Sequence, residues 1–165
     1  MSRTSDIFLI GSQAAKLGGF LPAWRAGHVH DIDLVTDEAT ARTIADTYGQ
    51  PFAPHAPGSE YLSHPVKFDI DYAAMPERWA LLDKLCPVAQ AVPIAGYALP
   101  LRVAPVEVVW AIRAFTVGLT TGTLAKGVED ALWYDAQPKQ ITDDHMRLAH
   151  IYRRIGLEAA KARMR

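Results

Sequence analysis

The stretch Ile7-Phe8-Leu9-Ile10-Gly11-Ser12, followed downstream by Asp31-Ile32-Asp33-Leu34, decides the predicted fold. The first stretch is an apolar run that ends in Gly-Ser, which indicates a buried strand leading into a turn or helix. In the second stretch polar and apolar residues alternate. The side chains of Asp31 and Asp33 should therefore point to the same face of a strand, and the apolar residues to the opposite, buried face.

A second acidic strand is predicted in Lys67-Phe68-Asp69-Ile70-Asp71-Tyr72, where two carboxylates again share one face. Adjacent carboxylates repel each other, so such a pair needs a compensating cation or a raised pKa. Carboxylates, together with waters and phosphate oxygens, are the ligands that Mg²⁺ prefers. We therefore predict that Asp31, Asp33 and at least one of Asp69 and Asp71 converge on a metal site. The sequence does not choose between the last two, and Asp69 is the preferred candidate.

This layout resembles the DNA polymerase β-like nucleotidyltransferase superfamily. Its motif is matched over roughly residues 6–72 by Gly11-Ser12, by Asp31-Ile32-Asp33-Leu34 and by an acidic strand with Asp69 or Asp71. The resemblance implies an α/β (α+β) fold, in which a small mixed sheet with flanking helices is followed by a helical C-terminal half. It also implies that two Mg²⁺ ions, held by these carboxylates, support transfer of a nucleoside monophosphate from an NTP to a hydroxyl acceptor, with release of pyrophosphate.

Phosphate contacts are predicted from glycine, hydroxyl and cationic positions. At a helix N-terminus, Gly11 and Ser12 would let backbone N–H groups and a hydroxyl approach a triphosphate. Lys126 and Asp130 have the i, i+4 spacing that places two side chains on one face of a helix. The resemblance implies that this face lines the substrate cleft. Each cation could equally be a surface charge. The predicted nucleotide-binding residues are Gly11, Ser12, Lys16, Arg25, Lys126 and Asp130.

The hydrophobic pattern divides the chain into an α/β core over residues 1–104 and a helical region over residues 105–165. Ser12 is the expected N-cap of the first helix, and Gly18 and Gly19 should end it. Pro100 argues that the strand at 99–103 lies at a sheet edge. The pattern predicts strands at 6–11, 31–36, 61–62, 66–73 and 99–103, and helices at 12–17, 37–48 and 77–85.

The second half carries three apolar stripes at helical spacing. They should pack against the sheet and leave a cleft with the aspartates on its floor, because exposed apolar stripes are unfavourable and ligand sites favour such junctions. The stripes consist of Val108, Val109, Ile112 and Phe115; of Leu124, Val128 and Leu132; and of Leu148, Ile151, Tyr152, Ile155 and Ala159.

Composition narrows the class of protein. The chain has 165 residues, of which 50% are hydrophobic and 21% charged, and its net charge is −1. Without a basic excess, no large nucleic-acid footprint is expected. The single cysteine, Cys86, cannot form an internal disulfide and is predicted to be a small buried residue. Because the sequence shows no signal peptide and no long apolar run, we expect a cytoplasmic protein without a membrane partner.

Several alternatives stay open. The acceptor could be a protein side chain, a small molecule or a nucleic-acid end. The same fold could also serve as an inactive module that binds a nucleotide or a partner protein. His28 and His30, just before Asp31, could instead hold Zn²⁺ or Fe²⁺ in a metallohydrolase. Trp24, in a loop, is the best candidate for stacking on a base.

Overall fold

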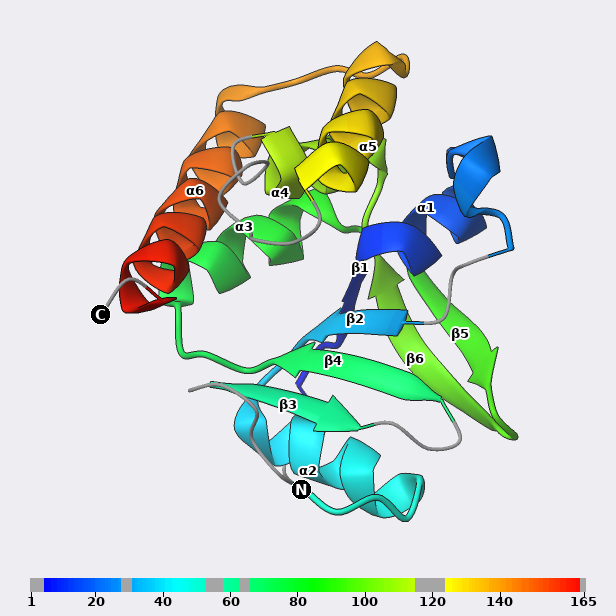
Figure 1. The fold of residues 1–165 in the computed structure, drawn as a ribbon. Coiled ribbons are helices and arrows are strands. Elements are labelled where there is room, and N and C mark those ends of the chain that lie inside the picture. The colour runs from blue at the N-terminus through cyan, green and yellow to red at the C-terminus, as the bar shows by residue number, and fades with distance from the viewer. Residues whose placement is uncertain (1–4, 28–30, 53–57, 63–65, 115–123, 164–165) are drawn as a thin grey trace.

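The computed structural model describes residues 5–27, 31–52, 58–62, 66–114 and 124–163. It shows a mixed sheet with the strand order β3-β4-β2-β1-β6-β5 (Figure 1). β1 runs antiparallel to β2 and parallel to β6, β2 runs parallel to β4, and the outer strands pair antiparallel. The strands are β1 (Phe8–Ile10), β2 (Asp31–Val35), β3 (Ser59–Leu62), β4 (Lys67–Asp71), β5 (Ala89–Ile94) and β6 (Tyr97–Val103).

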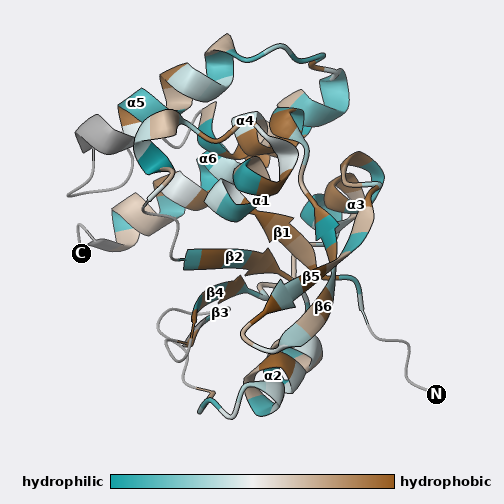
Figure 2. Ribbon diagram, turned by 90° about the vertical axis from the view of Figure 1, so that its right-hand side faces the viewer, coloured by the Kyte–Doolittle hydropathy of each residue, from teal (hydrophilic) through white to brown (hydrophobic). Residues whose placement is uncertain are grey.

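Helices cover both faces of the sheet. One face carries α2 alone, and the other helices gather over the opposite face (Figures 1 and 2). No helix in the described residues is both long enough and apolar enough to cross a bilayer. The helices are α1 (Gly11–Gly18), α2 (Glu38–Thr47), α3 (Pro76–Leu85), α4 (Val106–Ala114), α5 (Leu124–Ala136) and α6 (Asp143–Arg163), with a short 3₁₀ turn, η1 (Ala23–Arg25).

Aromatic contacts join the helices to the two faces of the sheet. Phe8 of β1 meets Trp79 of α3 edge to face, with ring centroids 4.9 Å apart. On the other side of the sheet, Tyr48 follows α2 and contacts Phe68 of β4 at 4.9 Å. Phe8 and Phe68 are fully buried, and each such side chain contributes roughly 1.5–3 kcal/mol to folding.

The predicted fold class is confirmed: a mixed sheet with flanking helices is followed by helices in the C-terminal part. The acidic strands fall at β2 and β4, and Gly19 ends α1 in the left-handed conformation. Asp37 caps α2 by accepting a hydrogen bond of 2.6 Å from the backbone N–H of Thr40. A division into two domains at residue 104 stays a prediction.

The predicted place of the strand at 99–103 is wrong. This strand, β6, lies between β1 and β5 instead of at an edge of the sheet. The strand β5, which forms a hairpin with β6, was not predicted. Pro100 is tolerated because β6 pairs with β1 only through Arg102 and Val103, while Pro100 pairs with β5 alone. Its missing N–H therefore removes no bond to β1.

Ser12 is not the N-cap of α1. The helix begins one residue earlier, at Gly11, and Ile10 occupies the capping position without a side-chain hydrogen bond. Gly11 has a φ of +71°, a conformation that glycine adopts without a steric penalty. The chain therefore turns directly from β1 into α1 and brings Ser12 into the first helical turn.

The apolar stripe predicted for α5 is wrong. Val128 and Leu132 are exposed, at 36% and 65%, while Asp130 and Tyr134 are buried. The side chain of Leu124 lies outside the described part. The helix is rotated from the expected face because Asp130 is bonded to residues of η1, and this long-range contact leaves no trace in the local sequence.

The apolar faces of α4 and α6 are largely as predicted. Ile112 and Ile155 are half-buried, whereas Ala159 near the end of α6 is exposed, contrary to the prediction. Phe115 lies outside the described residues. The residues of these two stripes that are buried are Val108, Val109, Leu148, Ile151 and Tyr152.

Candidate active site

Two aspartates on neighbouring parallel strands stand side by side. In the register of β2 and β4, Asp33 is the partner of Asp69. Partners in register on adjacent strands project to the same face, and adjacent strands lie about 4.8 Å apart. The structure therefore brings these two predicted residues together, on the face of the sheet that also carries Phe8 and α3.

Asp31 has a different neighbour. Its register partner on β4 is Lys67, and the Lys67 Nζ lies 3.4 Å from the Asp31 Oδ1. Both side chains are exposed, so this ion pair adds little to stability. Asp31 therefore sits beside a cation at the start of β2.

Asp71 is tied to α3. Arg78 donates to both of its carboxylate oxygens, at 2.7 and 3.1 Å, and the backbone N–H of Ala73 donates to Oδ1 at 3.0 Å. Burial by itself lowers the pKa of the Arg78 guanidinium, but its bonds to Asp71 raise the pKa above the usual value. Of the two candidates for the third carboxylate, Asp69 is the one beside Asp33, and Asp71 bonds to a buried arginine.

Asp31, Asp33 and Asp69 share one face of the sheet, and their convergence on a single metal ion stays a prediction. Within the described ranges, no group of three or more His, Cys, Asp or Glu side chains is arranged to hold a metal ion. The physical reason lies in the neighbours, because Lys67 faces Asp31 and Arg78 binds Asp71. What the fold assembles is the pair Asp33 and Asp69.

The environment of Asp33 disfavours its charged form. Burial is the largest cause, and the nearby carboxylates of Asp69 and Asp31 add to it. Arg113 and Lys67 partly oppose this effect, and the pKa of Asp33 rises to about 6. Arg113, in the last turn of α4, is thus a site residue that the sequence reasoning missed. Its only local signal was a basic residue at the end of an apolar helix.

Gly11 is in close contact with Asp33. A Cβ built on Gly11 would lie 2.4 Å from Asp33 Oδ2, well inside van der Waals contact. The backbone of the strand-to-helix turn therefore packs directly on the carboxylate, and no side chain fits between them. Gly11 therefore lies against Asp33, and its contact with a phosphate stays a prediction.

Tyr134 of α5 is a second residue that the sequence reasoning missed. Its side chain is 2% exposed, and burial followed by the nearby Asp130 raises the pKa of its phenol. Arg113, Arg25 and the hydroxyl of Ser12 lower that pKa, so all of these groups lie near the phenol. Tyr134 thus connects the start of α1 with α4 and α5.

Arg25 and Asp130, both predicted to contact the nucleotide, bind each other. Arg25 donates through Nε at 3.2 Å and through Nη2, and the indole of Trp24 donates to Asp130 Oδ1 at 3.2 Å. The Trp24 ring also packs edge to face on Trp133, at 5.5 Å. These contacts fasten η1 to α5. A stacking role for Trp24, which is 47% exposed, stays a prediction.

The remaining candidates are either exposed, buried away from solvent, or outside the described part of the chain. Lys16 is exposed in the last turn of α1. Lys126 belongs to the first turn of α5, but its side chain lies outside the described part, as do His28 and His30. Cys86 is buried as predicted, and burial raises the pKa of its thiol to about 12, which leaves it a poor nucleophile.

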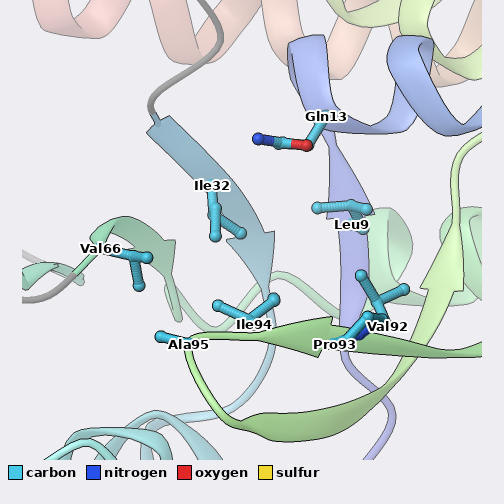
Figure 3. Close-up of a pocket in the computed structure, with 8 residues that line it drawn as sticks. All are labelled: Leu9, Gln13, Ile32, Val66, Val92, Pro93, Ile94 and Ala95. Atoms are coloured by element: carbon cyan, nitrogen blue, oxygen red, sulfur yellow. The ribbon is translucent and has the colours of Figure 1, made fainter.

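A cavity of about 230 Å³ lies on the other face of β1 and β2 (Figure 3). Leu9 and Ile32 line it from the sheet, and Ile94 and Ala95 close it from the hairpin of β5 and β6. Gln13 of α1 contributes an amide. The walls are otherwise apolar, so this cavity does not suit a phosphate.

The pair Asp33 and Asp69 suits a magnesium ion. Mg²⁺ in proteins is usually bound through one or two carboxylates, with waters and substrate phosphates completing its octahedron. The repulsion that raises the pKa of Asp33 is also what a divalent cation would relieve. The number of ions, predicted as two, stays a prediction.

Comparison with known proteins gives little. No family model matches the chain, and no curated protein matches it. A solution structure of the antibiotic-resistance factor ANT(2'')-Ia is similar over 97% of this chain and 84% of that chain, with 17% sequence identity and a TM-score of 0.40. A TM-score this low does not establish a shared fold.

Proposed function

We propose that this protein is a Mg²⁺-dependent nucleotidyltransferase, which transfers a nucleoside monophosphate from an NTP to a hydroxyl acceptor and releases pyrophosphate. The observation that carries the proposal is the register of Asp33 with Asp69, next to the Gly11 turn at the start of α1. Two adjacent carboxylates beside a helix N-terminus combine a site for a cation with a site for an anion.

Each element of the site has a defined task in this proposal. Asp33 and Asp69 would hold Mg²⁺, which supplies charge neutralisation at the phosphates and activation of the attacking hydroxyl. The backbone of Gly11 and the first turn of α1 would receive the triphosphate. Arg113, whose charge already acts on Asp33, would add a positive charge near the transferred group.

The test is titration calorimetry with Mg²⁺ and a non-hydrolysable analogue of each NTP. Asp69→Asn should abolish binding, because it removes one of two ligand charges. Asp46→Asn is the matched control, because Asp46 is an exposed carboxylate of α2 on the opposite face of the sheet, and the change should alter affinity less than about fivefold. If no analogue binds the wild-type protein, or if both variants behave alike, the proposal fails.

The number of metal ions is a separate measurement. Titration with Mn²⁺ in place of Mg²⁺, followed by electron paramagnetic resonance in the presence of the bound analogue, counts the ions. Two ions would confirm the sequence prediction. One ion would limit the site to the pair of carboxylates that lie in register.

One observation favours a second candidate, a module that binds nucleotides without catalysis. Asp31 and Asp71, both predicted as metal ligands, form ion pairs with Lys67 and Arg78. Both candidates predict binding, so turnover separates them. Release of pyrophosphate from a labelled NTP in the presence of a cell extract would favour the enzyme, whereas tight binding without release would favour the module.

A further inference from the structure

A cavity of about 890 Å³ opens at the end of β4, where the start of α3 and the last turns of α6 meet. Its volume falls within the range of roughly 300–1,000 Å³ that is typical of small-molecule sites. Asp71 and Met75 line it from the segment between β4 and α3, and α6 supplies most of the opposite wall.

The wall from α6 is an apolar trough. Ile151, Ile155, Ala159 and Ala162 line the cavity from successive turns of the helix. They span twelve residues, from Ile151 to Ala162, which is about 16 Å at the rise of an α-helix. Ile151 is buried, Ile155 is half-buried, and the two alanines are exposed, so the trough is closed at Ile151 and open at Ala162.

This trough explains why Ala159 departs from the predicted packing. The apolar stripe of α6 continues beyond the part that is buried in the core, and its last turns face the cavity. Apolar surface that is exposed in a concave site is favourable to cover. The wall therefore suits the apolar body of a ligand.

Asp71 supplies a carboxylate to the lining, which also contains Ser59, Glu77, Arg154 and Glu158. Its Oδ2 accepts one hydrogen bond from Arg78, whereas Oδ1 accepts from Ala73 and Arg78. A carboxylate can accept about four hydrogen bonds, and this side chain is 34% exposed. Arg78 also lines the cavity, but it is 2% exposed and its guanidinium donates to Asp71. The Asp71 carboxylate therefore favours a ligand group that donates a hydrogen bond and disfavours an anionic group.

The charges at the rim neutralise one another. Arg154 lies 3.6 Å from Glu77, and Lys161 lies 3.4 Å from Glu158, all on exposed side chains. Exposed pairs of this kind contribute little affinity. Of the carboxylates that line the cavity, Asp71 is the least exposed, at 34% compared with 64% for Glu77 and 70% for Glu158.

We propose that this cavity binds a small amphipathic molecule, with an elongated apolar body along α6 and a hydroxyl or amine head that donates to Asp71. The site is separate from the pair Asp33 and Asp69, and the proposal does not depend on nucleotidyl transfer. Asp71 is two residues from Asp69 on the same face of β4, so a bound head group lies next to that pair.

The test uses three probes that differ only in the head group: decylamine, 1-decanol and decanoate, each below its aggregation concentration. Titration calorimetry with the full chain should give saturable binding of the amine and the alcohol. Decanoate should bind on the order of tenfold more weakly or not at all, because Asp71 repels its carboxylate. Equal binding of all three would overturn the proposed head-group recognition.

The location is tested by filling the trough. Ala159→Trp and Ala162→Trp change exposed residues that line the cavity, so both variants should fold and lose binding of decylamine. Arg153→Trp is the control, because Arg153 is exposed on the same helix and does not line the cavity. Methyl NMR of Ile151 and Ile155 should shift on titration. Unchanged methyl signals, or binding that survives both filling variants, would refute the site.

Discussion

Asp69 and Asp71, two residues apart on β4, have different chemistry because their neighbours differ. Asp69 stands in register with Asp33, which is half-buried and has a raised pKa. Asp71 instead accepts two hydrogen bonds from a nearly buried guanidinium, that of Arg78. Two carboxylates in register form a candidate site for a metal ion, whereas a carboxylate that holds a buried arginine is part of the fold.

Asp33→Asn should abolish nucleotide binding without lowering the stability of the ligand-free protein. The pKa of about 6 in the folded state lies above the usual aspartate value of 3.8, so the ionised carboxylate weakens the fold increasingly as the pH rises from about 4 through 6. The substitution removes that penalty. Without ligand, the free energy of unfolding at pH 7–8 should therefore hold or rise by up to roughly 3 kcal/mol, and the gain should vanish near pH 4.

Urea unfolding at a series of pH values measures this effect, and calorimetry with Mg²⁺ and an NTP analogue measures binding. We expect Asp33→Asn to lose binding in the same samples. An apo protein that is clearly less stable at pH 7 than the wild type would show that Asp33 is structural, and unchanged nucleotide affinity would remove it from the site.

Gly11→Ala should destabilise the protein more than Gly19→Ala, although the two substitutions cause similar backbone strain. Gly11 and Gly19 both have positive φ, at 71° and 76°. A methyl group on Gly11 meets Asp33 at 2.4 Å, while one on Gly19 meets nothing within 4 Å. Strain in either variant costs about 1 kcal/mol, and the clash adds roughly 1–3 kcal/mol to Gly11→Ala.

Thermal and urea unfolding compare the two variants, and only Gly11→Ala should lose nucleotide binding. If Gly11→Ala and Gly19→Ala lose the same stability, the added methyl group at Gly11 does not strain the contact with Asp33. Nucleotide binding that survives Gly11→Ala would mean that the turn does not support the carboxylates.

At the scale of elements, η1 and α5 are joined through one buried carboxylate. Asp130 is 1% exposed and receives Trp24 and Arg25 from the loop after α1. Trp133, three residues later, donates to the backbone carbonyl of Phe20 at 2.8 Å. The loop that connects α1 with β2 is therefore held by the helical half of the molecule.

The coupling between Arg25 and Asp130 should be large for a single ion pair. A double-mutant cycle with Arg25→Met and Asp130→Asn should give roughly 1–3 kcal/mol, because the pair is largely withdrawn from water. The control cycle uses Glu38 and Arg42 on α2, an exposed pair at 3.0 Å that should give about 0.3–0.5 kcal/mol. Urea unfolding measures both cycles, and similar coupling energies would contradict the structural role of Asp130.

At the scale of the whole molecule, the C-terminal helices complete the layer over one face of the sheet (Figure 1). α6 packs on α4 and on α3, and its residues Leu148 and Ile151 are fully buried. α4 also contacts α1, the helix that begins at the site. The sheet and the C-terminal helices therefore share one core.

A chain that ends at Ala104 should be insoluble or molten. Removing α4–α6 would expose the apolar surface of α3 and of the sheet beneath it, and each large side chain that loses burial loses roughly 1.5–3 kcal/mol. Near-UV circular dichroism and urea unfolding of residues 1–104 provide the measurement. A cooperatively folded fragment that still binds a nucleotide would identify the helices as a separate module.

Residues close in the chain were enough to predict the alternation of the two acidic strands and the starts of α2 and α3, because these features depend on near neighbours. Asp37 at the start of α2 and Pro76 at the start of α3 are examples. The place of β6 in the sheet and the meeting of Asp33 with Asp69 needed the tertiary structure, since both depend on strand pairing between distant segments. Arg113 lies far from Asp33 in the sequence, and no local pattern connects them. The same holds for Asp130, whose burial depends on partners more than a hundred positions away.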